Sequence, residues 1–255
     1  MKIFIKSWKA GSSSAKELRN AVKGKLIRAK NSKYNHKPAT HLVVNWGDSK
    51  CPEYDNILNH PRAVAKATDK YGCMQCFDWH DVSMPTSFYT KQGAQAYLEK
   101  NEGGVIYCRT ILNGSKGAGI VVATSVDEVV DANLYTAGIT GERIEYRIHV
   151  FNGKVIHQQQ KKKRDGWRDN PNFSDTIRNL DGGWVFAIKD VEASPVCLLT
   201  ATEAVRALGL DFGGVDIVQT PDGNAYVIEV NTACGLHGTT IDKYREAIQG
   251  YVAGL

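Results

Sequence analysis

The chain has 255 residues, of which 42% are hydrophobic and 23% are charged, and this composition excludes a disordered chain and a fibrous repeat. Its net charge of +5 is unevenly distributed along the sequence. Residues 1–37 hold eleven Lys and Arg against one acidic residue, and residues 154–168 hold six against one. The remaining residues carry a net negative charge, so two basic segments stand within an otherwise acidic chain.

Hydropathy and cysteine usage indicate the compartment. No apolar run approaches the roughly 20 residues that span a bilayer, and the opening MKIFIKSWK places lysines where a signal peptide has its hydrophobic stretch. The six cysteines are scattered, which is typical of reduced thiols. Cys73 and Cys76 form a CxxC without a second pair at zinc spacing, so we interpret them as ordinary helix residues. These features predict a cytoplasmic protein with no membrane partner.

A small β-α-β lobe is predicted first. Residues 2–8 alternate charged and bulky side chains like a strand, and residues 41–46 (HLVVNW) read as a buried strand. Between them, Ser14 and Glu17 have the spacing of a capping box, which predicts a helix beginning there. The apolar face of that helix would comprise Leu18, Ala21, Val22 and Leu26.

The segment 59–77 is predicted to be one helix, with Pro61 in its first turn. We place the end of the first lobe at residue 77, followed by a linker near 78–87. Pro85 favours extended backbone in that linker.

A central lobe is expected over residues 78–137. Two strand-like runs, 104–111 and 119–124, flank a glycine-rich loop. This loop joins a strand to a strand and lacks the Lys and Ser/Thr of a P-loop, although its N–H groups can still fold over phosphates. Ser125 and Glu128 then have the spacing that caps another helix.

The third lobe is expected over residues 138–255, and its last hairpin carries the strongest signal. Asp222-Gly223 favours a two-residue turn, so paired residues should sum to 445. Asp216 then lies opposite Glu229, with Cβ atoms about 5 Å apart, and Asn231 shares their face. Facing carboxylates repel unless a cation neutralises them, and Mg²⁺ prefers such oxygen ligands. We therefore predict a metal site, in preference to a solvent-exposed polar edge.

Another hairpin turns at Asn152-Gly153, which predicts pairs that sum to 305. On this register Arg147 lies opposite Gln158. The same face would present Arg143, Glu145, Arg147, Gln158, Gln160 and Lys162. An ordinary exposed charged face is an equal alternative at this point.

Two helices complete the lobe. One is predicted to begin at Thr200, with Glu203 completing a capping box, and to end at Gly209. The other closes the chain from about Thr239.

The order of these motifs, from about residue 59 to 236, resembles the ATP-grasp superfamily, and most closely its small RimK-like carboxylate-amine ligases, including short phage-type versions. The run Ile228–Thr232 is the most specific part of the match. The resemblance implies an α/β (α+β) fold in which two α+β lobes clasp ATP beside a short N-terminal α/β lobe.

The resemblance also implies roles for particular residues. One or two Mg²⁺ ions, replaceable by Mn²⁺, would be held by Asp216, Glu229 and Asn231. Glu145 would hold the ribose hydroxyls, with Glu142 as the competing candidate. The full set implied to contact ATP is Lys70, Arg109, Ser115, Lys116, Gly117, Gly119, Tyr135, Thr136, Ala137 and Glu145. The set implied to act at the transferring phosphoryl group is Arg147, Lys162, Arg178 and Asn179.

The activity implied by the resemblance is ATP-dependent formation of an amide through an acyl phosphate, with release of ADP and phosphate. An ATP-grasp kinase and a non-catalytic nucleotide- or polyanion-binding protein remain alternatives. The basic segments suit an acidic peptide, a protein tail or a nucleic acid as substrate, because they would steer anions. The sequence leaves the oligomeric state open.

Overall fold

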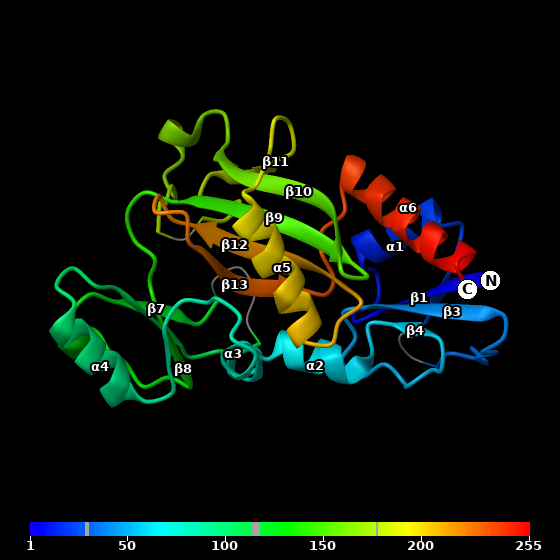
Figure 1. Cartoon of the computed structure of the whole chain (residues 1–255), viewed down its shortest axis with the longest axis horizontal. Coiled ribbons are helices and arrows are strands. Elements are labelled where there is room, and N and C mark those ends of the chain that lie inside the picture. The colour runs from blue at the N-terminus through cyan, green and yellow to red at the C-terminus, as the bar shows by residue number, and fades with distance from the viewer. Residues whose placement is uncertain (29–30, 114–117, 177) are drawn as a thin grey trace.

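The computed structural model describes residues 1–28, 31–113, 118–176 and 178–255. Three β-sheets follow one another along an elongated molecule (Figure 1). An N-terminal sheet with α1 and α6 lies at one end, a large five-stranded sheet crossed by α5 lies in the middle, and a small four-stranded sheet with α4 lies at the other end. Two α+β lobes beside a short N-terminal α/β lobe are the arrangement that the resemblance implies.

The N-terminal sheet has the strand order β2-β1-β3-β4, and its paired strands are all parallel. Its elements are β1 (Lys2–Ser7), α1 (Ser13–Ala21), β2 (Lys25–Ile27), β3 (His41–Trp46) and β4 (Ile57–Leu58). The two predicted strands are confirmed, while the short β2 and β4 were not predicted. The helix cap was predicted wrongly. Ser12 accepts the Ala15 N–H at 3.3 Å, because the hydroxyl of Ser14 instead accepts the indole N–H of Trp46 at 3.0 Å.

The single helix predicted over 59–77 is two helices, α2 (Pro61–Thr68) and α3 (Lys70–Trp79). Pro61 occupies the first turn as predicted. Asp69 breaks the run with extended backbone, and its carboxylate accepts the Tyr71 N–H at 3.2 Å. An Asp that can cap the next helix competes with helical continuation at this position.

The small sheet has the order β5-β8-β6-β7, and its paired strands are antiparallel. Its elements are β5 (Ser87–Phe88), α4 (Lys91–Lys100), β6 (Ile106–Arg109), β7 (Ile120–Ala123) and β8 (Leu134–Ala137). Helix α4 was not predicted. The helix predicted from Ser125 is only a 3₁₀ turn, Val126–Glu128, since Ser125 makes no capping hydrogen bond with its side chain and Val129 is extended. The Glu128 carboxylate accepts the N–H and hydroxyl of Thr124 at 2.7 and 2.8 Å.

The large sheet has the order β11-β10-β9-β12-β13 and is antiparallel throughout. Its elements are β9 (Ile144–Phe151), β10 (Lys154–Lys163), β11 (Trp184–Ala187), α5 (Pro195–Ala207), β12 (Phe212–Gln219) and β13 (Ala225–Asn231). Helix α5 begins earlier than predicted, because Ser194 and not Thr200 caps it, accepting the Cys197 N–H at 3.4 Å.

The last helix, α6 (Thr239–Ala253), begins where it was predicted and lies beside α1 at the N-terminal end of the molecule (Figure 1). Its Tyr244 packs edge-on against Trp46 and Phe212 in a shared, fully buried aromatic cluster. The C-terminal segment therefore completes the core beneath the N-terminal sheet. Within the described ranges no helix has both the length and the hydrophobicity needed to cross a bilayer.

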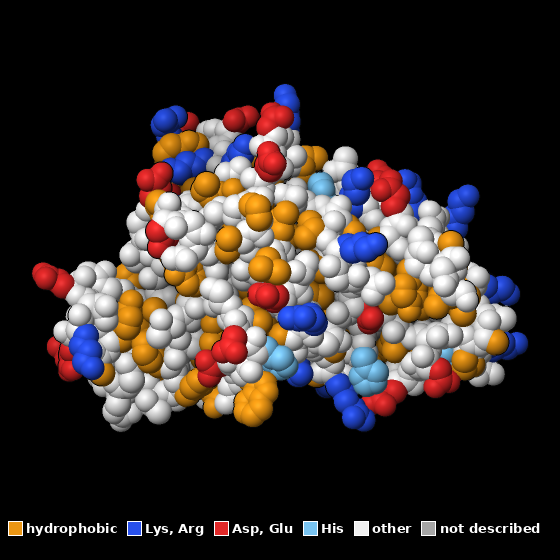
Figure 2. Space-filling model, viewed as in Figure 1, with side chains coloured by type: hydrophobic (Ala, Val, Ile, Leu, Met, Phe, Trp, Pro, Cys, Tyr) orange, Lys and Arg blue, Asp and Glu red, His pale blue; other side chains and the backbone are white. Residues whose placement is uncertain are grey.

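The basic N-terminal segment is mostly surface. Lys6 is the exception, since it is buried and pairs with Asp48 at 3.0 Å. Among the described residues of 1–37, no other Lys or Arg forms a salt bridge. Figure 2 shows Lys and Arg side chains spread over this end of the molecule.

Asn59 joins the N-terminal sheet to the large sheet. Its side chain is fully buried, donates to the Phe212 carbonyl at 2.9 Å, and accepts the N–H groups of Asp211 and Phe212 at 2.8 and 3.0 Å. Its backbone N–H donates to the Asp211 carboxylate, and its carbonyl accepts from Asn45. This amide side chain thus links the two sheets through three buried hydrogen bonds, beside the stacking of Trp46 on Phe212.

Asn59→Ala should lower the free energy of unfolding by about 3 kcal/mol, because it leaves three buried backbone groups without partners. Alanine also tolerates the positive φ of this position less well than asparagine. Urea unfolding measures the loss. Asn101→Ala, which removes one exposed helix-end bond to Tyr97, is the matched control and should cost less than about 1 kcal/mol. Equal losses for the two variants would contradict the role of Asn59.

Candidate active site

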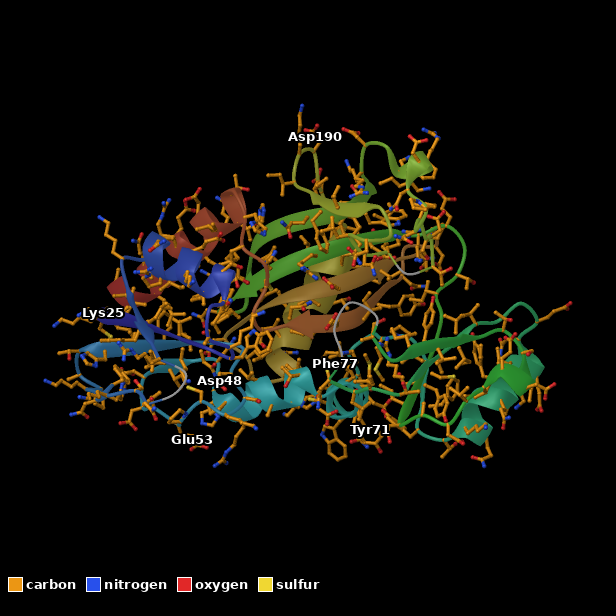
Figure 3. All side chains as sticks on the ribbon, turned by 180° about the vertical axis from the view of Figure 1, so that it is seen from behind. Lys25, Asp48, Glu53, Tyr71, Phe77 and Asp190 are labelled. Atoms are coloured by element: carbon orange, nitrogen blue, oxygen red, sulfur yellow. The ribbon has the colours of Figure 1, made fainter. Side chains whose placement is uncertain are left out.

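A cavity of about 620 Å³ lies between the large sheet and the small sheet, and both contribute its walls. Seen from behind, α3 with Tyr71 and Phe77 lies between these two sheets (Figure 3). Eleven predicted site residues line the cavity: Lys70, Arg109, Thr136, Ala137, Glu145, Arg147, Arg178, Asn179, Asp216, Glu229 and Asn231.

The other predicted residues are placed differently. Ser115, Lys116 and Gly117 lie outside the described residues, and Gly119 is not part of the cavity wall although its neighbours Ala118 and Ile120 are. Tyr135, which the resemblance implies to contact ATP, does not turn its side chain toward the cavity. Its ring is buried in the core of the small sheet, where its hydroxyl donates to the Val130 carbonyl at 3.1 Å.

Asp216 of β12 lies directly opposite Glu229 of β13, as the hairpin register predicts. The register reaches this pairing by two compensating irregularities. Near the turn Gln219 pairs with Ala225, so the loop is longer than the two residues expected. A bulge at Ile228 then adds one residue to β13 and restores the pairing. The bulge also brings Ile228 to the cavity wall beside Glu229.

The prediction that Lys162 faces this site is wrong. The Asn152-Gly153 turn pairs Phe151 with Lys154 as expected, but a bulge follows, and Arg147 pairs with Gln159. One extra residue reverses which side chains share a face. Lys161 therefore points into the cavity, while Lys162 pairs with Val185 on β11 and is exposed. Because the residues that follow this bulge are all polar, the bulge does not change the pattern of residue types, and the sequence gives no sign of it.

Arg147 and Asp216 form a two-pronged salt bridge across β9 and β12. Nε and Nη2 of Arg147 donate to the two carboxylate oxygens at 2.6 and 2.7 Å. The guanidinium also stacks on Phe186, 4.3 Å from the ring centroid. Burial raises the pKa of Asp216, but the guanidinium outweighs it and holds that pKa below its usual value. Asp216 is therefore ionised in the ligand-free protein.

Within the described part of the chain, Glu229 has no guanidinium bound to it that would compensate its charge in this way. The pKa of its carboxyl group is raised, first by burial and then by the neighbouring Asp216, and the charges of Lys70, Arg147 and Arg109 only partly oppose this. Among the residues that the structure describes, no cation lies within salt-bridge distance of Glu229.

Asn231 completes a set of oxygen donors with Asp216 and Glu229, and its Nδ2 lies 3.4 Å from Asp216 Oδ2. A hard cation takes carboxylate and amide oxygens, and it would neutralise the excess negative charge on Glu229. The donor set therefore fits Mg²⁺.

Two of the cations that line the cavity, Lys70 and Arg109, come from elements outside the large sheet. Lys70 is the first residue of α3, and its Nζ donates to the Leu112 carbonyl at 3.3 Å. Arg109 ends β6, and its Nε donates to Thr136 Oγ1 at 3.4 Å. Burial lowers the pKa of Arg109, although Glu229 opposes this. These cations suit the phosphates of a nucleotide, and the apolar parts of the wall, Ile120, Ile139, Val218 and Ile228, suit a base.

Glu145 lies within a cluster of cations. Its buried carboxylate accepts from Arg143 and Lys161 at 3.1 and 3.0 Å, and the Arg178 Nε lies 3.5 Å away. Glu142, the alternative ribose ligand, is exposed and does not line the cavity. The pairing of Glu145 with Lys161 depends on the β10 bulge, so sequence analysis missed it.

The chain belongs to the ATP-grasp family, since the model of the "ATP-grasp domain, R2K clade family 3" matches residues 79–246. Curated relatives include the "Probable alpha-L-glutamate ligase" of Aeromonas salmonicida, 29% identical over 193 residues, which are 71% of this chain and 61% of the relative. The protein of the same name from Psychromonas ingrahamii is 26% identical over 193 residues, 71% and 60% of the two chains. The chain thus spans about 60% of these relatives' length.

Solved structures share the fold over nearly the whole chain. The ATP-grasp ligase PsnB, complexed with minimal precursor, Mg and ADP, has a TM-score of 0.67 at 14% identity, with 98% of this chain and 96% of PsnB covered. D-alanyl-alanine synthetase A from Vibrio cholerae has a TM-score of 0.64 at 14% identity, covering 99% and 98%. A RimK domain protein from Sphaerobacter thermophilus has 0.61 at 11% identity, covering 98% and 100%. These likenesses show that the chain has the ATP-grasp fold.

Glu229→Gln should raise the melting temperature of the ligand-free protein at pH 7. Because the pKa of Glu229 is raised, its ionised form destabilises the fold at neutral pH, and this cost disappears as the pH falls through the folded-state pKa. Thermal unfolding between pH 7 and 4 measures the effect, which should shrink towards the acid end. Glu102→Gln, at an exposed position, should change little. A variant less stable than the parent at pH 7 would refute this.

Proposed function

We propose that this protein is an ATP-dependent carboxylate-amine ligase. One observation carries the proposal. A single cavity brings together the oxygen donors Asp216, Glu229 and Asn231 and positively charged side chains from both neighbouring sheets. The chain that forms this cavity belongs to the ATP-grasp family. A nucleoside triphosphate with its divalent cation matches that arrangement, because the cation suits the oxygen donors and the phosphates suit the positive side chains.

Each group has a separate task in this proposal. Lys70 and Arg109 bind phosphate oxygens from the small-sheet side, and the backbone near Thr136 and Ala137 meets the base. Arg147, held by Asp216 and Phe186, faces the site of phosphoryl transfer with little freedom to move. Mg²⁺, when bound, neutralises charge on the phosphates. Catalysis then depends on fixed positive charge and position, and needs no nucleophilic side chain.

The reaction proceeds in two displacements. An oxygen of the substrate carboxylate attacks the γ-phosphorus of ATP, the bond to the bridging oxygen breaks, and ADP leaves with that electron pair. The amine nitrogen then attacks the acyl carbon, inorganic phosphate leaves, and the nitrogen loses a proton to give the amide. Lys161 and Arg178 line the cavity with Asn179 and are proposed to stabilise the acyl phosphate.

Glutamate is the proposed amine substrate, supported by the name of the curated relatives, and a peptide or protein carboxylate is the proposed acceptor, supported by the precursor-bound PsnB structures. The exposed cations of residues 1–37 favour an acidic acceptor, by steering rather than by specific contact. We also propose a cytoplasmic location, which six unbridged cysteines support.

Purified protein supplied with ATP, Mg²⁺, glutamate and an acidic peptide should release ADP and phosphate only when both organic substrates are present. Hydroxylamine in place of the amine should yield a hydroxamate, because it traps an acyl phosphate. ADP release with a stable phosphorylated product and no hydroxamate would identify a kinase. No turnover across a panel of amino acids and peptides, together with tight polyanion binding, would favour the non-catalytic alternative.

Lys161→Ala should lower kcat about 100-fold, because it removes one of the charges proposed at the transferring group. Lys162→Ala is the matched control, one residue along the same strand, and should keep activity near that of the parent since its side chain lies outside the cavity. Steady-state ADP release measures both. If Lys162→Ala lowered kcat more than Lys161→Ala did, the bulged register of β10 would not be that of the active protein.

A further inference from the structure

A chain of buried hydrogen bonds runs from β9 through β10 to α6. His149 is fully buried, and its Nδ1 lies 3.1 Å from the Tyr244 hydroxyl. Its Nε2 lies 3.1 Å from Gln159 Oε1, and Gln159 Nε2 donates to Thr240 Oγ1 at 3.2 Å. Tyr244 and Thr240 belong to α6, which begins beside β10 (Figure 1). The hydrogen bonds therefore tie the start of the last helix to the large sheet.

The donor and acceptor roles in this chain of hydrogen bonds are fixed. Burial lowers the pKa of His149 to about 4, so the ring is neutral at pH 7 and carries one N–H. An amide oxygen can only accept, so Nε2 of His149 donates to Gln159, and Nδ1 accepts from the Tyr244 hydroxyl. Loss of either ring nitrogen would leave a buried polar partner unpaired.

The same hydrogen-bonded group reaches the loop between β13 and α6, residues 232–238. Burial raises the pKa of Cys234 to about 11, so its thiol is protonated, and a hydrogen bond joins it to the Tyr244 side chain. The sulfur fills the space beside Gly214, where a Cβ would collide with it. The loop is therefore connected to His149 through Tyr244.

Gly235 of this loop lines the cavity, and its two neighbours Cys234 and Leu236 are buried. All residues of the loop are described, and they form no helix or strand. Apart from its chain neighbours, no described atom lies closer than 3.9 Å to the place of a Cβ on Gly235, so this residue borders open space. Its position therefore depends on the buried contacts of the residues beside it.

The order of residues along β12 shows which end of the cavity the loop forms. Val218 belongs to the wall suited to a base, Asp216 to the proposed metal donors, and Gly214 comes next. Alternate residues of a strand share a face at steps of about 7 Å. Because Cys234 packs on Gly214, the loop with Gly235 lies past the proposed metal donors, on the side away from the base. At that end, under the proposed function, the acceptor carboxylate meets the γ-phosphate.

We propose that His149 and Tyr244 are positioning residues, which hold the loop 232–238 so that Gly235 shapes the acceptor end of the cavity. The identity of the ligand at that end rests on the proposed function. The holding of the loop rests on the hydrogen bonds alone. Neither side chain is part of the described cavity wall, so both act through the loop.

Tyr244→Phe tests the proposal, because it removes one hydroxyl and keeps the buried ring. Tyr251→Phe is the matched control on the same helix, since the Tyr251 hydroxyl makes no hydrogen bond among the described residues. Amide hydrogen exchange of the ligand-free protein reports residues 232–240, and calorimetry gives the affinity for ADP with Mg²⁺. Steady-state assays with glutamate and an acidic peptide give kcat/KM for the peptide. Thermal unfolding checks that each variant is folded.

We expect Tyr244→Phe to speed amide exchange in residues 232–240 about 5-fold or more, because the loop loses a buried hydrogen bond. The kcat/KM for the peptide should fall about 10-fold, while the ADP affinity stays within about 2-fold of the parent. Tyr251→Phe should match the parent in all three. Unchanged exchange would refute the holding of the loop by Tyr244. Equal losses of ADP affinity and of kcat/KM would show that the loop does not serve the acceptor.

His149→Asn and His149→Phe test the other partner of this hydrogen bond. His149→Asn retains an acceptor for the Tyr244 hydroxyl near the place of Nδ1, whereas His149→Phe retains none. Exchange in residues 232–240 should therefore be slower in His149→Asn, and equal exchange in both would contradict the role of His149. If the parent turned over no peptide, the proposed function and the acceptor assignment would fail together. Exchange would still decide whether these two residues hold the loop.

Discussion

The site depends on an unequal sharing of positive charge between two facing carboxylates. Arg147 neutralises Asp216 through two short hydrogen bonds and leaves Glu229 with a raised pKa and no salt bridge among the described residues. A pair balanced by two arginines would be a structural ion pair with no need of a metal. This pair instead retains negative charge on Glu229, which under the proposed function a divalent cation neutralises.

The rest of the fold brings positive charge to that pair from several directions. Arg109 arrives on the small sheet, Lys70 at the start of α3, and Lys161 on β10. None of these elements pairs with β13 in a sheet. Their meeting depends on how the sheets pack about α3, and Asn59 holds the N-terminal sheet to the same body through buried backbone hydrogen bonds.

Sequence reasoning succeeded for the facing pair of carboxylates. The pairing of Asp216 with Glu229 follows from turn chemistry and strand alternation, and it holds in the structure even though the turn is longer than expected. The same reasoning failed at Lys162, since a bulge after Val155 reversed the faces of β10. The bulge in β13 preserved the predicted pairing of Asp216, whereas the bulge in β10 overturned the predicted position of Lys162. Both arise from packing between strands, which no run of residues in one strand records.

The sequence by itself determined the fold family, the long hairpins, the closing helix and the residue types of the face proposed to hold the metal, because these depend on turn residues, alternation and the order of motifs. Only the tertiary structure decided that Lys161 and not Lys162 faces the cavity, that Arg147 neutralises Asp216, and that Glu145 is enclosed by cations. Those facts depend on distances between strands and loops far apart in the chain. Such distances are set by packing and by the burial of charge, and they leave no periodic trace in the sequence.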